Sequence, residues 1–239
     1  MGLYRIDLHN HSSLSPCAED DLSPFLLAIQ AKEKGIDFLG LSDHNSTANL
    51  KAFAEACRIV DLVPFFGIEV TTIEEVHVLV SFEHLDPALA FGSWVDEHLP
   101  WYPNNEKLFG RQLVYDEEGD QTTEVGRMLA LATTLSFEEV IGKALSEGAL
   151  AIPAHIDRGS NGVLSNLGFL PELPYSAIEV VRPGSEFAKL GYPVLTASDA
   201  HRFEEVGIRS CMMELSDRSA GALIAALNGR RCGEHTKRG

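Results

Sequence analysis

Basic residues are scarce in this chain. Lys and Arg number 19 against 35 Asp and Glu, which gives a formal net charge of −16 at pH 7. Binding to a nucleic-acid backbone generally needs a surplus of Lys and Arg, so a long nucleic acid is not the expected partner. There is also no run of basic residues of the kind that binds an anionic membrane surface.

Cysteines are few, and none are paired by short spacing. The four are Cys17, Cys57, Cys211 and Cys232, with no Cys-x-x-Cys among them. Such scattering is typical of neither a disulfide framework nor a thiolate zinc finger, and it favours a reducing compartment.

Long hydrophobic stretches are missing too. The longest apolar runs, Val76–Phe82 and Ala149–Ala154, are far shorter than the ~18 residues needed to cross a bilayer. The N-terminus reaches Asp7 and then two histidines without the apolar stretch of a signal peptide. We therefore expect a cytoplasmic protein with no membrane partner. The oligomeric state is left open.

What the chain does contain is an alternation of strand-like and helix-like segments. The predicted strands are Tyr4–Leu8, Asp37–Ser42, Leu62–Glu69, Val76–Phe82, Ala149–Ala154, Ala177–Val181, Pro193–Ala197 and Ser210–Glu214. The predicted helices are Pro24–Lys34, Ala48–Val60, Pro87–Leu99, Thr122–Ala132, Phe137–Glu147 and Ser219–Leu227. The alternation predicts an α/β fold with βα units around a parallel sheet, either a barrel or an open sheet.

The length of 239 residues suits one domain over residues 1–239, with an inserted excursion around 84–135. Within it, the polar stretch Pro100–Gln121 is long for a loop in a compact domain. Loops of that length tend to be functional, so we expect a lid or a specificity element there.

Histidines and carboxylates stand where the predicted strands end. They are His9 and His11, Asp43 and His44, Glu69, His155, and Asp199 and His201, while His77 stands near the start of its strand. In parallel α/β folds, ligands and catalytic groups gather at the carboxyl ends of the strands. These side chains are therefore expected to meet at one end of the sheet.

The spacing of these residues suits metal binding. In an extended chain, the side chains of His9 and His11 point to the same face, so both imidazoles can reach one ion. Asp199 and His201 repeat that spacing with a carboxylate. Imidazole and carboxylate ligands without thiolates suit Zn, Mn or Fe. The set exceeds what one ion takes, so two or three divalent ions are predicted, with Glu69 bridging two ions in the manner of phosphate-ester hydrolases.

In these residues the chain resembles the PHP (polymerase and histidinol phosphatase) family of metal-dependent phosphoesterases. The matching positions are Asp7, His9, His11 and Ser12; Ser42, Asp43, His44 and Asn45; Gly67 and Glu69; His77; His155; and Ser198, Asp199 and His201. The resemblance implies a distorted seven-stranded (β/α) TIM-like barrel with a metal site at the C-terminal face of its strands.

The resemblance also implies a ligand set for each of three ions. His9, His11, Glu69 and Asp199 would hold the first; Glu69, His77 and His155 the second; and His44 and His201 the third. Glu69, His11 and Asp199 are the predicted catalytic residues. The family usually has an Asp or His five or six residues after the second histidine, whereas this chain has Cys17 there. Cys17 is therefore a candidate ligand, as is Asp20 nearby.

Three arginines are candidates for binding the phosphoryl group, because a guanidinium can donate two parallel hydrogen bonds to its oxygens. Arg158 follows His155, Arg202 follows His201, and Arg182 is a weaker candidate after a strand end.

These residues predict a hydrolase that attacks a phosphomonoester or phosphodiester with metal-activated water. The substrate would be a nucleotide or another small phosphorylated metabolite. Two alternatives stay open. An amidohydrolase-type C–N hydrolase also begins with His-x-His, but it often bridges its metals with a carbamylated lysine where this chain has Glu69. A non-catalytic, metal-stabilised regulatory module is the other alternative.

Overall fold

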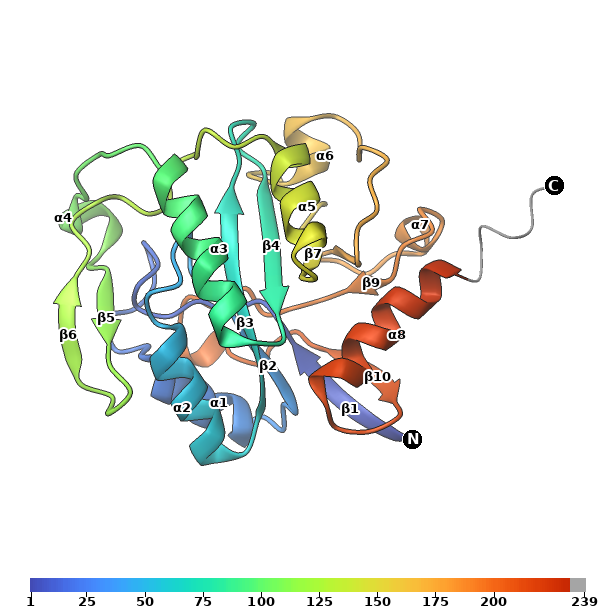
Figure 1. Ribbon diagram of the computed structural model, residues 1–239, viewed down its shortest axis with the longest axis horizontal. Coiled ribbons are helices and arrows are strands. Elements are labelled where there is room, and N and C mark those ends of the chain that lie inside the picture. Colours follow the sequence, from blue (N-terminus) through green and yellow to red (C-terminus); the bar gives the residue numbers. More distant parts are fainter. Residues whose placement is uncertain (233–239) are drawn as a thin grey trace.

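The computed structural model describes residues 1–232, and its framework is a six-stranded sheet curled into a half-barrel (Figure 1). The strands follow the spatial order β10-β1-β2-β3-β4-β7. Their bounds are β1 Gly2–Asp7, β2 Phe38–Leu41, β3 Val63–Thr71, β4 His77–Phe82, β7 Leu150–Pro153 and β10 Cys211–Leu215. The mixed α/β class expected from the sequence is what the structure shows.

The sheet is not uniformly parallel. Strands β1, β2 and β3 are parallel to one another, but β4 runs antiparallel to both β3 and β7, and β10 runs antiparallel to β1. The expectation of a parallel sheet is therefore wrong for β4 and β10. For β4 the reason is the short turn that joins it to β3, which leaves no room for a crossover helix. As a result, His77 pairs with Thr71 and lies at the carboxyl end of β3.

A second, parallel pair consists of β8 (Ile178–Glu179) and β9 (Val194–Leu195). Irregular backbone hydrogen bonds join this pair to both sides of the half-barrel. Near β7, the Ile156 amide donates to the Glu179 carbonyl oxygen at 2.8 Å. Near β1, the Asp199 amide donates to the His9 carbonyl oxygen, also at 2.8 Å.

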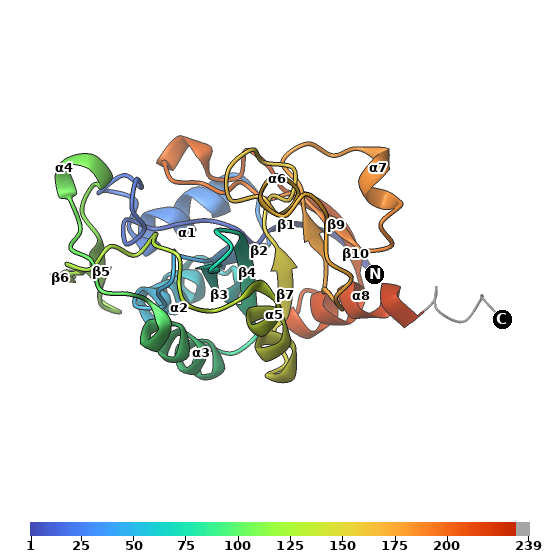
Figure 2. The ribbon, with the colours of Figure 1, turned by 90° about the horizontal axis from the view of Figure 1, so that it is seen from above.

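Helices pack around the sheet (Figure 2). The longer ones are α1 Pro24–Glu33, α2 Leu50–Val60, α3 Leu85–His98, α5 Phe137–Ser146 and α8 Ala220–Cys232. Two starts have side-chain caps: the hydroxyl of Ser23 accepts from the Leu26 amide, and Ser136 and Glu139 form a capping box. The short helices are α6 Val163–Asn166, α7 Ser185–Ala188 and the 3-10 turn Phe203–Glu205. None of the helices within residues 1–232 is long and apolar enough to cross a membrane.

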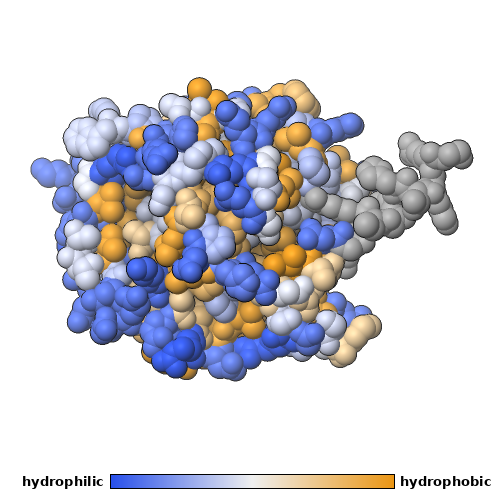
Figure 3. Space-filling model, in the orientation of Figure 1, coloured by the Kyte–Doolittle hydropathy of each residue, from blue (hydrophilic) through white to orange (hydrophobic). Residues whose placement is uncertain are grey.

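Alternating side chains of the strands form two cores. On β2, Leu39 and Leu41 belong to the core beneath the helices, whereas Phe38 belongs to a separate inner core. Leu223 and Leu227 of α8 join that inner core. On the face in Figure 3, hydrophilic residues dominate the margin, and apolar patches lie nearer the centre.

The excursion has more structure than the sequence indicates. The stretch predicted as the loop Pro100–Gln121 contains α4 (Glu106–Phe109) and β5 (Leu113–Tyr115), and β5 forms a hairpin with β6 (Gln121–Glu124). In Figure 1 these elements lie at the end of the molecule away from α8.

The helix predicted at Thr122–Ala132 is wrong, because tertiary hydrogen bonds keep this backbone extended. The Gln112 side chain donates to the carbonyl oxygens of Val125 and Arg127 and accepts from the Leu129 amide. Those backbone groups are therefore not available to a helix.

Candidate metal centre

The histidines and carboxylates at the strand ends converge. In three groups, one ligand atom of each residue lies within 4.8 Å of the others. The groups are His9, His11, Glu69 and Asp199; His44, Glu69 and His77; and His11, His44 and His201. The first group contains the same residues as the first predicted ligand set, and Glu69 is common to the first two groups. His155 lies outside these groups, but its Nε2 is 3.0 Å from Glu69 Oε1.

Backbone hydrogen bonds between neighbouring strand ends bring these side chains together. The Glu69 amide donates to the Asp43 carbonyl oxygen at 3.1 Å, and the Asn45 amide donates to the Glu69 carbonyl oxygen at 2.9 Å. The reversed direction of β4 brings His77 to the same end. The positions of these side chains therefore follow from the pairing of the strands.

Glu69 lies at the middle of the cluster and is fully buried. Its Oε1 is 2.8 Å from His77 Nδ1, and its Oε2 is 3.0 Å from His44 Nδ1. The second contact lacks hydrogen-bond geometry, so Glu69 Oε2 and His44 Nδ1 have no hydrogen-bond partner in the described part of the chain. Buried ligand atoms without partners are what a cation site requires.

The orientation of two imidazoles supports the same conclusion. His9 Nδ1 lies 2.8 Å from Glu179 Oε2, and His11 Nδ1 lies 2.9 Å from Ser15 Oγ. When the Nδ1 atom of each ring is the hydrogen-bond donor in its contact, the lone pairs of both Nε2 atoms face the cluster. The two Nε2 atoms are only 3.2 Å apart. A divalent cation between them and the carboxylates would satisfy these atoms, so the residues fit a metal ion.

The electrostatics also favour a positive charge at the centre. Burial opposes ionisation of Glu69, but the surrounding histidines His77, His9 and His44 hold its pKa well below the usual range. Burial would lower the pKa of His11, yet Asp199 and Glu69 raise it to about 9. The ionised carboxylates thus attract positive charge, which a bound metal ion would also supply.

The outer histidines behave differently. Burial, together with the neighbouring His11, lowers the pKa of His44 to about 4 and that of His201 to about 3. Neutral imidazoles of this kind have a lone pair free for a metal ion.

Unusual backbone conformations gather at this site. Asn45, His155 and Asp199 have positive φ angles of 47°, 30° and 50°. Non-glycine residues rarely adopt such values, and they are typical of functional sites, where surrounding structure holds the strain.

A cavity of about 330 Å³ opens over the cluster. Arg158 lines it, and its Nη1 donates to Asp199 Oδ2 at 2.7 Å. Cys17 also lines the cavity, with an exposed side chain, but belongs to none of the three ligand groups. Arg182 and Arg202 are exposed and do not line the cavity, so the structure brings only Arg158 of the three arginines to this site.

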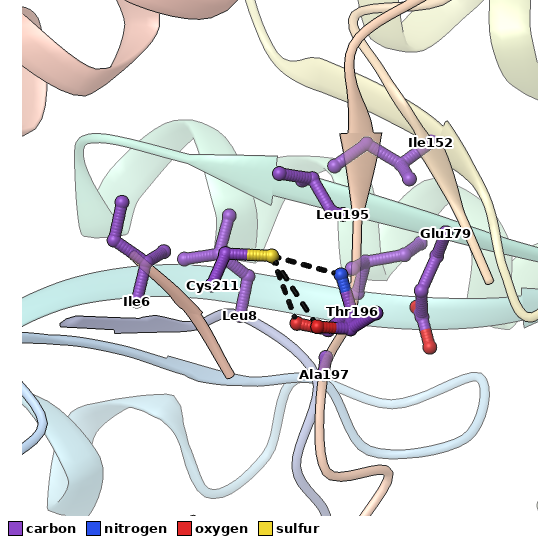
Figure 4. Close-up of a pocket in the computed structure, with 9 residues that line it drawn as sticks. Ile6, Leu8, Ile152, Glu179, Leu195, Thr196, Ala197 and Cys211 are labelled. Atoms are coloured by element: carbon purple, nitrogen blue, oxygen red, sulfur yellow. Dashed lines mark hydrogen bonds between the residues drawn. The ribbon is translucent and has the colours of Figure 1, made fainter. Parts of the chain in front are cut away.

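Glu179 was missed by the sequence analysis. It is buried on β8, where it contacts His9 and lines a small cavity inside the half-barrel together with Cys211 and Leu195 (Figure 4). The signal was present as a carboxylate within the predicted apolar strand Ala177–Val181.

A half-barrel sheet with a histidine–carboxylate cluster at one end is the arrangement of one class of metal-dependent hydrolases. The PHP domain family model matches residues 7–152, and the chain belongs to that family. A comparison with curated proteins found no match.

Solved structures show the same fold. Endonuclease Q from Pyrococcus furiosus matches with 19% identity and a TM-score of 0.70, over 95% of this chain and 56% of its own. Endonuclease Q in complex with a 27-mer duplex carrying an abasic lesion matches with 18% identity and a TM-score of 0.72, over 95% of this chain and 57% of that one. This chain thus spans little more than half the length of Endonuclease Q.

For two further structures, the similarity covers most of this chain and most of the other protein. A suggested metal-dependent phosphoesterase from Bifidobacterium adolescentis has 17% identity and a TM-score of 0.56, over 82% of this chain and 87% of its own. An amidohydrolase from Chromobacterium violaceum with bound sulfate has 19% identity and a TM-score of 0.56, over 94% and 96%. At these identities the likeness establishes the fold alone.

Proposed function

We propose that this protein is a metal-dependent phosphoesterase, which hydrolyses a phosphomonoester or phosphodiester of a nucleotide or another small metabolite. The observation that supports this most strongly is the buried convergence of His9, His11, Glu69 and Asp199 beneath a cavity lined by Arg158. Two or three divalent ions (Zn, Mn or Fe) are the proposed cofactors, and a cytoplasmic location stays a prediction.

The geometry favours particular residues for each ion. His9, His11, Glu69 and Asp199 are the proposed ligands of the first. Glu69, His77 and His155 serve the second. The third takes His44 and His201, because the one free lone pair of His11 is already used by the first ion. Cys17 remains a candidate for this last ion because it lines the same cavity.

When bound, such ions activate a water molecule and neutralise charge that develops on the phosphoryl oxygens. The protein itself orients the side chains that would bind these ions. Glu179 and Ser15 fix the rings of His9 and His11 through their Nδ1 atoms, so that the Nε2 lone pairs face the centre. Arg158 is placed to donate to a phosphoryl oxygen from the cavity wall.

We also propose that the strands close into a barrel. Strands β1, β2, β3, β4, β7, β8 and β9 would form a distorted seven-stranded ring, with β10 added outside β1 and the metal site at its C-terminal face. The hydrogen bonds from Ile156 to Glu179 and from Asp199 to His9 support this closure. Residues 1–239 would be one domain with the excursion at 84–135; residues 233–239 lie outside those described.

Three alternatives differ in substrate or activity. The DNA complex of Endonuclease Q makes a nucleic acid the first of them. Amidohydrolase chemistry is the second, but no lysine is among the described residues that line the cavity. A non-catalytic regulatory module is the third.

The test is hydrolysis of a chromogenic phosphomonoester and phosphodiester by protein reconstituted with Mn, Zn or Fe, with a chelated control. We expect metal-dependent turnover that Glu69→Gln abolishes. The matched control Glu75→Gln changes an exposed carboxylate on the nearby turn and should leave turnover intact. Stoichiometric metal without turnover on either ester would favour the amidohydrolase or regulatory alternatives.

A further inference from the structure

The cavity over the cluster is lined by two chemically different sets of residues. One set consists of candidate ligands and Arg158. The other consists of four apolar residues, which we call the apolar wall: Pro16, Phe109, Met128 and Ala130. A site for a phosphoryl group alone would not need the apolar set, so the wall requires an explanation.

The apolar wall is fixed to the candidate metal centre by Asn45, which follows His44. The Asn45 side chain donates to the carbonyl oxygens of Leu129 and Leu131 at 2.6 and 2.8 Å, and these two residues flank Ala130. Its Oδ1 accepts from the Thr71 amide at 3.0 Å. A single buried side chain therefore sets the position of Ala130 relative to the ligands.

Separate hydrogen bonds hold the aromatic part of the wall, Phe109, in place. The Cys17 amide donates to the Phe109 carbonyl oxygen at 2.7 Å, which joins Phe109 to the segment of Pro16. Met128 is buried, and its amide donates to the Tyr102 carbonyl oxygen at 2.8 Å. The wall is thus an ordered surface built largely by the excursion.

Size and charge limit what can bind. A volume of about 330 Å³ is near the lower end of the ~300–1,000 Å³ typical of small-molecule pockets. Among the described lining residues, Arg158 is the one arginine or lysine, and it is already paired with Asp199. The lining therefore suits one phosphoryl group and offers no second arginine or lysine for another phosphate.

Building on the phosphoesterase function above, we propose that the substrate is a compact phosphate monoester whose alcohol part contains an uncharged ring. The phosphoryl group lies at the candidate ligands and Arg158, and the ring packs against Phe109 and Met128. A ring gains both apolar burial and favourable contacts with an aromatic face and a thioether. In this arrangement the apolar wall determines specificity and takes no part in bond cleavage.

Binding of two non-hydrolysable probes to Mn-loaded protein tests this proposal by calorimetry. Phenylphosphonate carries the ring, and methylphosphonate presents the same phosphoryl chemistry without it. We expect phenylphosphonate to bind at least about tenfold more tightly, as is usual for filling an apolar pocket. Met128→Ala should remove most of that difference, and Ala130→Leu should remove it by filling the space while keeping methylphosphonate binding.

Leu108→Ala is the matched control, because Leu108 is exposed beside Phe109 and does not line the cavity. Equal affinities for the two probes, no binding of either, or an Ala130→Leu variant that keeps the preference would overturn the proposal. If the protein releases phosphate but shows no preference for a ring, only the proposed role of the apolar wall in specificity would be overturned. A ring preference in protein that releases no phosphate from any ester would overturn the phosphoesterase function alone.

Discussion

Glu69 is the residue on which the candidate metal centre depends most. Its carboxylate is fully buried and lies within 3.3 Å of nitrogen atoms of five histidines: His9, His11, His44, His77 and His155. An ionised carboxylate at such a position is costly unless cations compensate it. Divalent ions shared with these imidazoles would supply that compensation.

Glu179 acts on this centre through His9. We expect Glu179→Gln to lower metal affinity by roughly 10- to 100-fold, as is usual when the hydrogen-bond partner of a metal-binding histidine is changed. Competition with a chelator measures the affinity directly. The control Glu172→Gln alters an exposed carboxylate in the preceding loop. Unchanged affinity in Glu179→Gln, or an equal loss in the control, would contradict a positioning role.

The cysteines offer a separate test of the third ion. Cys57 is buried, and burial raises the pKa of its thiol, so it should resist alkylation in the folded protein, whereas the exposed Cys17 should react. If Cys17 ligates a metal ion, saturating Zn will slow its modification at least tenfold, as peptide mapping by mass spectrometry can measure. Equal rates with and without metal would exclude Cys17 as a ligand.

Sequence reasoning works well for residues that follow strand ends. His9, Glu69 and Asp199 could be predicted from the order of strands and polar residues, since the strand ends meet at one edge. Glu179 was missed because the predicted strand extended to Val181, whereas β8 ends at Glu179. Arg202 follows the candidate ligand His201 yet is exposed, which shows that nearness in sequence does not determine where a long side chain points.

At the scale of elements, the close approach of β1 and β2 shapes the first ligand pair. A Cβ on Gly40 of β2 would lie 2.2 Å from the Leu8 carbonyl oxygen, next to His9. Gly40→Ala should therefore destabilise the fold by about 1–3 kcal/mol or more and weaken metal binding, because β1 must move.

Gly142→Ala is the matched control for that substitution. Gly142 lies in α5 with no atom within 4 Å of an added Cβ, and alanine is the better helix former. This variant should be stabilised by about 0.5–1 kcal/mol in chemical denaturation. Destabilisation of Gly142→Ala by as much as Gly40→Ala would show that the effect at Gly40 is not specific to the β1–β2 approach.

The sequence predictions that proved wrong did so because tertiary contacts, which the local sequence does not reveal, determine the structure there. Apolar spacing in Thr122–Ala132 is compatible with a helix, but Gln112 binds its backbone in an extended form. The direction of β4 depends on a turn whose geometry the apolar pattern of Val76–Phe82 does not encode. Hydrophobic periodicity predicts that a strand exists, but it does not predict which neighbour the strand pairs with.

For the whole molecule, the candidate metal centre brings together segments that are up to 192 residues apart in the chain, from His9 to His201. His9 follows β1 and Asp199 follows β9, so an ion bound between them would link distant segments. Each site filled at 100 times its Kd should add about 2.7 kcal/mol. That corresponds to a Tm increase of roughly 5–10 °C for a chain of this length.

Differential scanning calorimetry with and without a chelator measures this shift. Glu69→Gln should remove most of it, while Glu75→Gln should retain it. A Tm that is the same in metal-loaded and chelated protein would contradict the idea that ions link these segments.

The central claim is that divalent ions bind among His9, His11, Glu69 and Asp199. Anomalous diffraction from crystals of Mn- or Zn-loaded protein, recorded on both sides of the metal absorption edge, tests it most directly. The account predicts at least two peaks within the cluster, one of them in contact with all four of these side chains. Crystals with stoichiometric metal but no anomalous peak at Glu69 would contradict it.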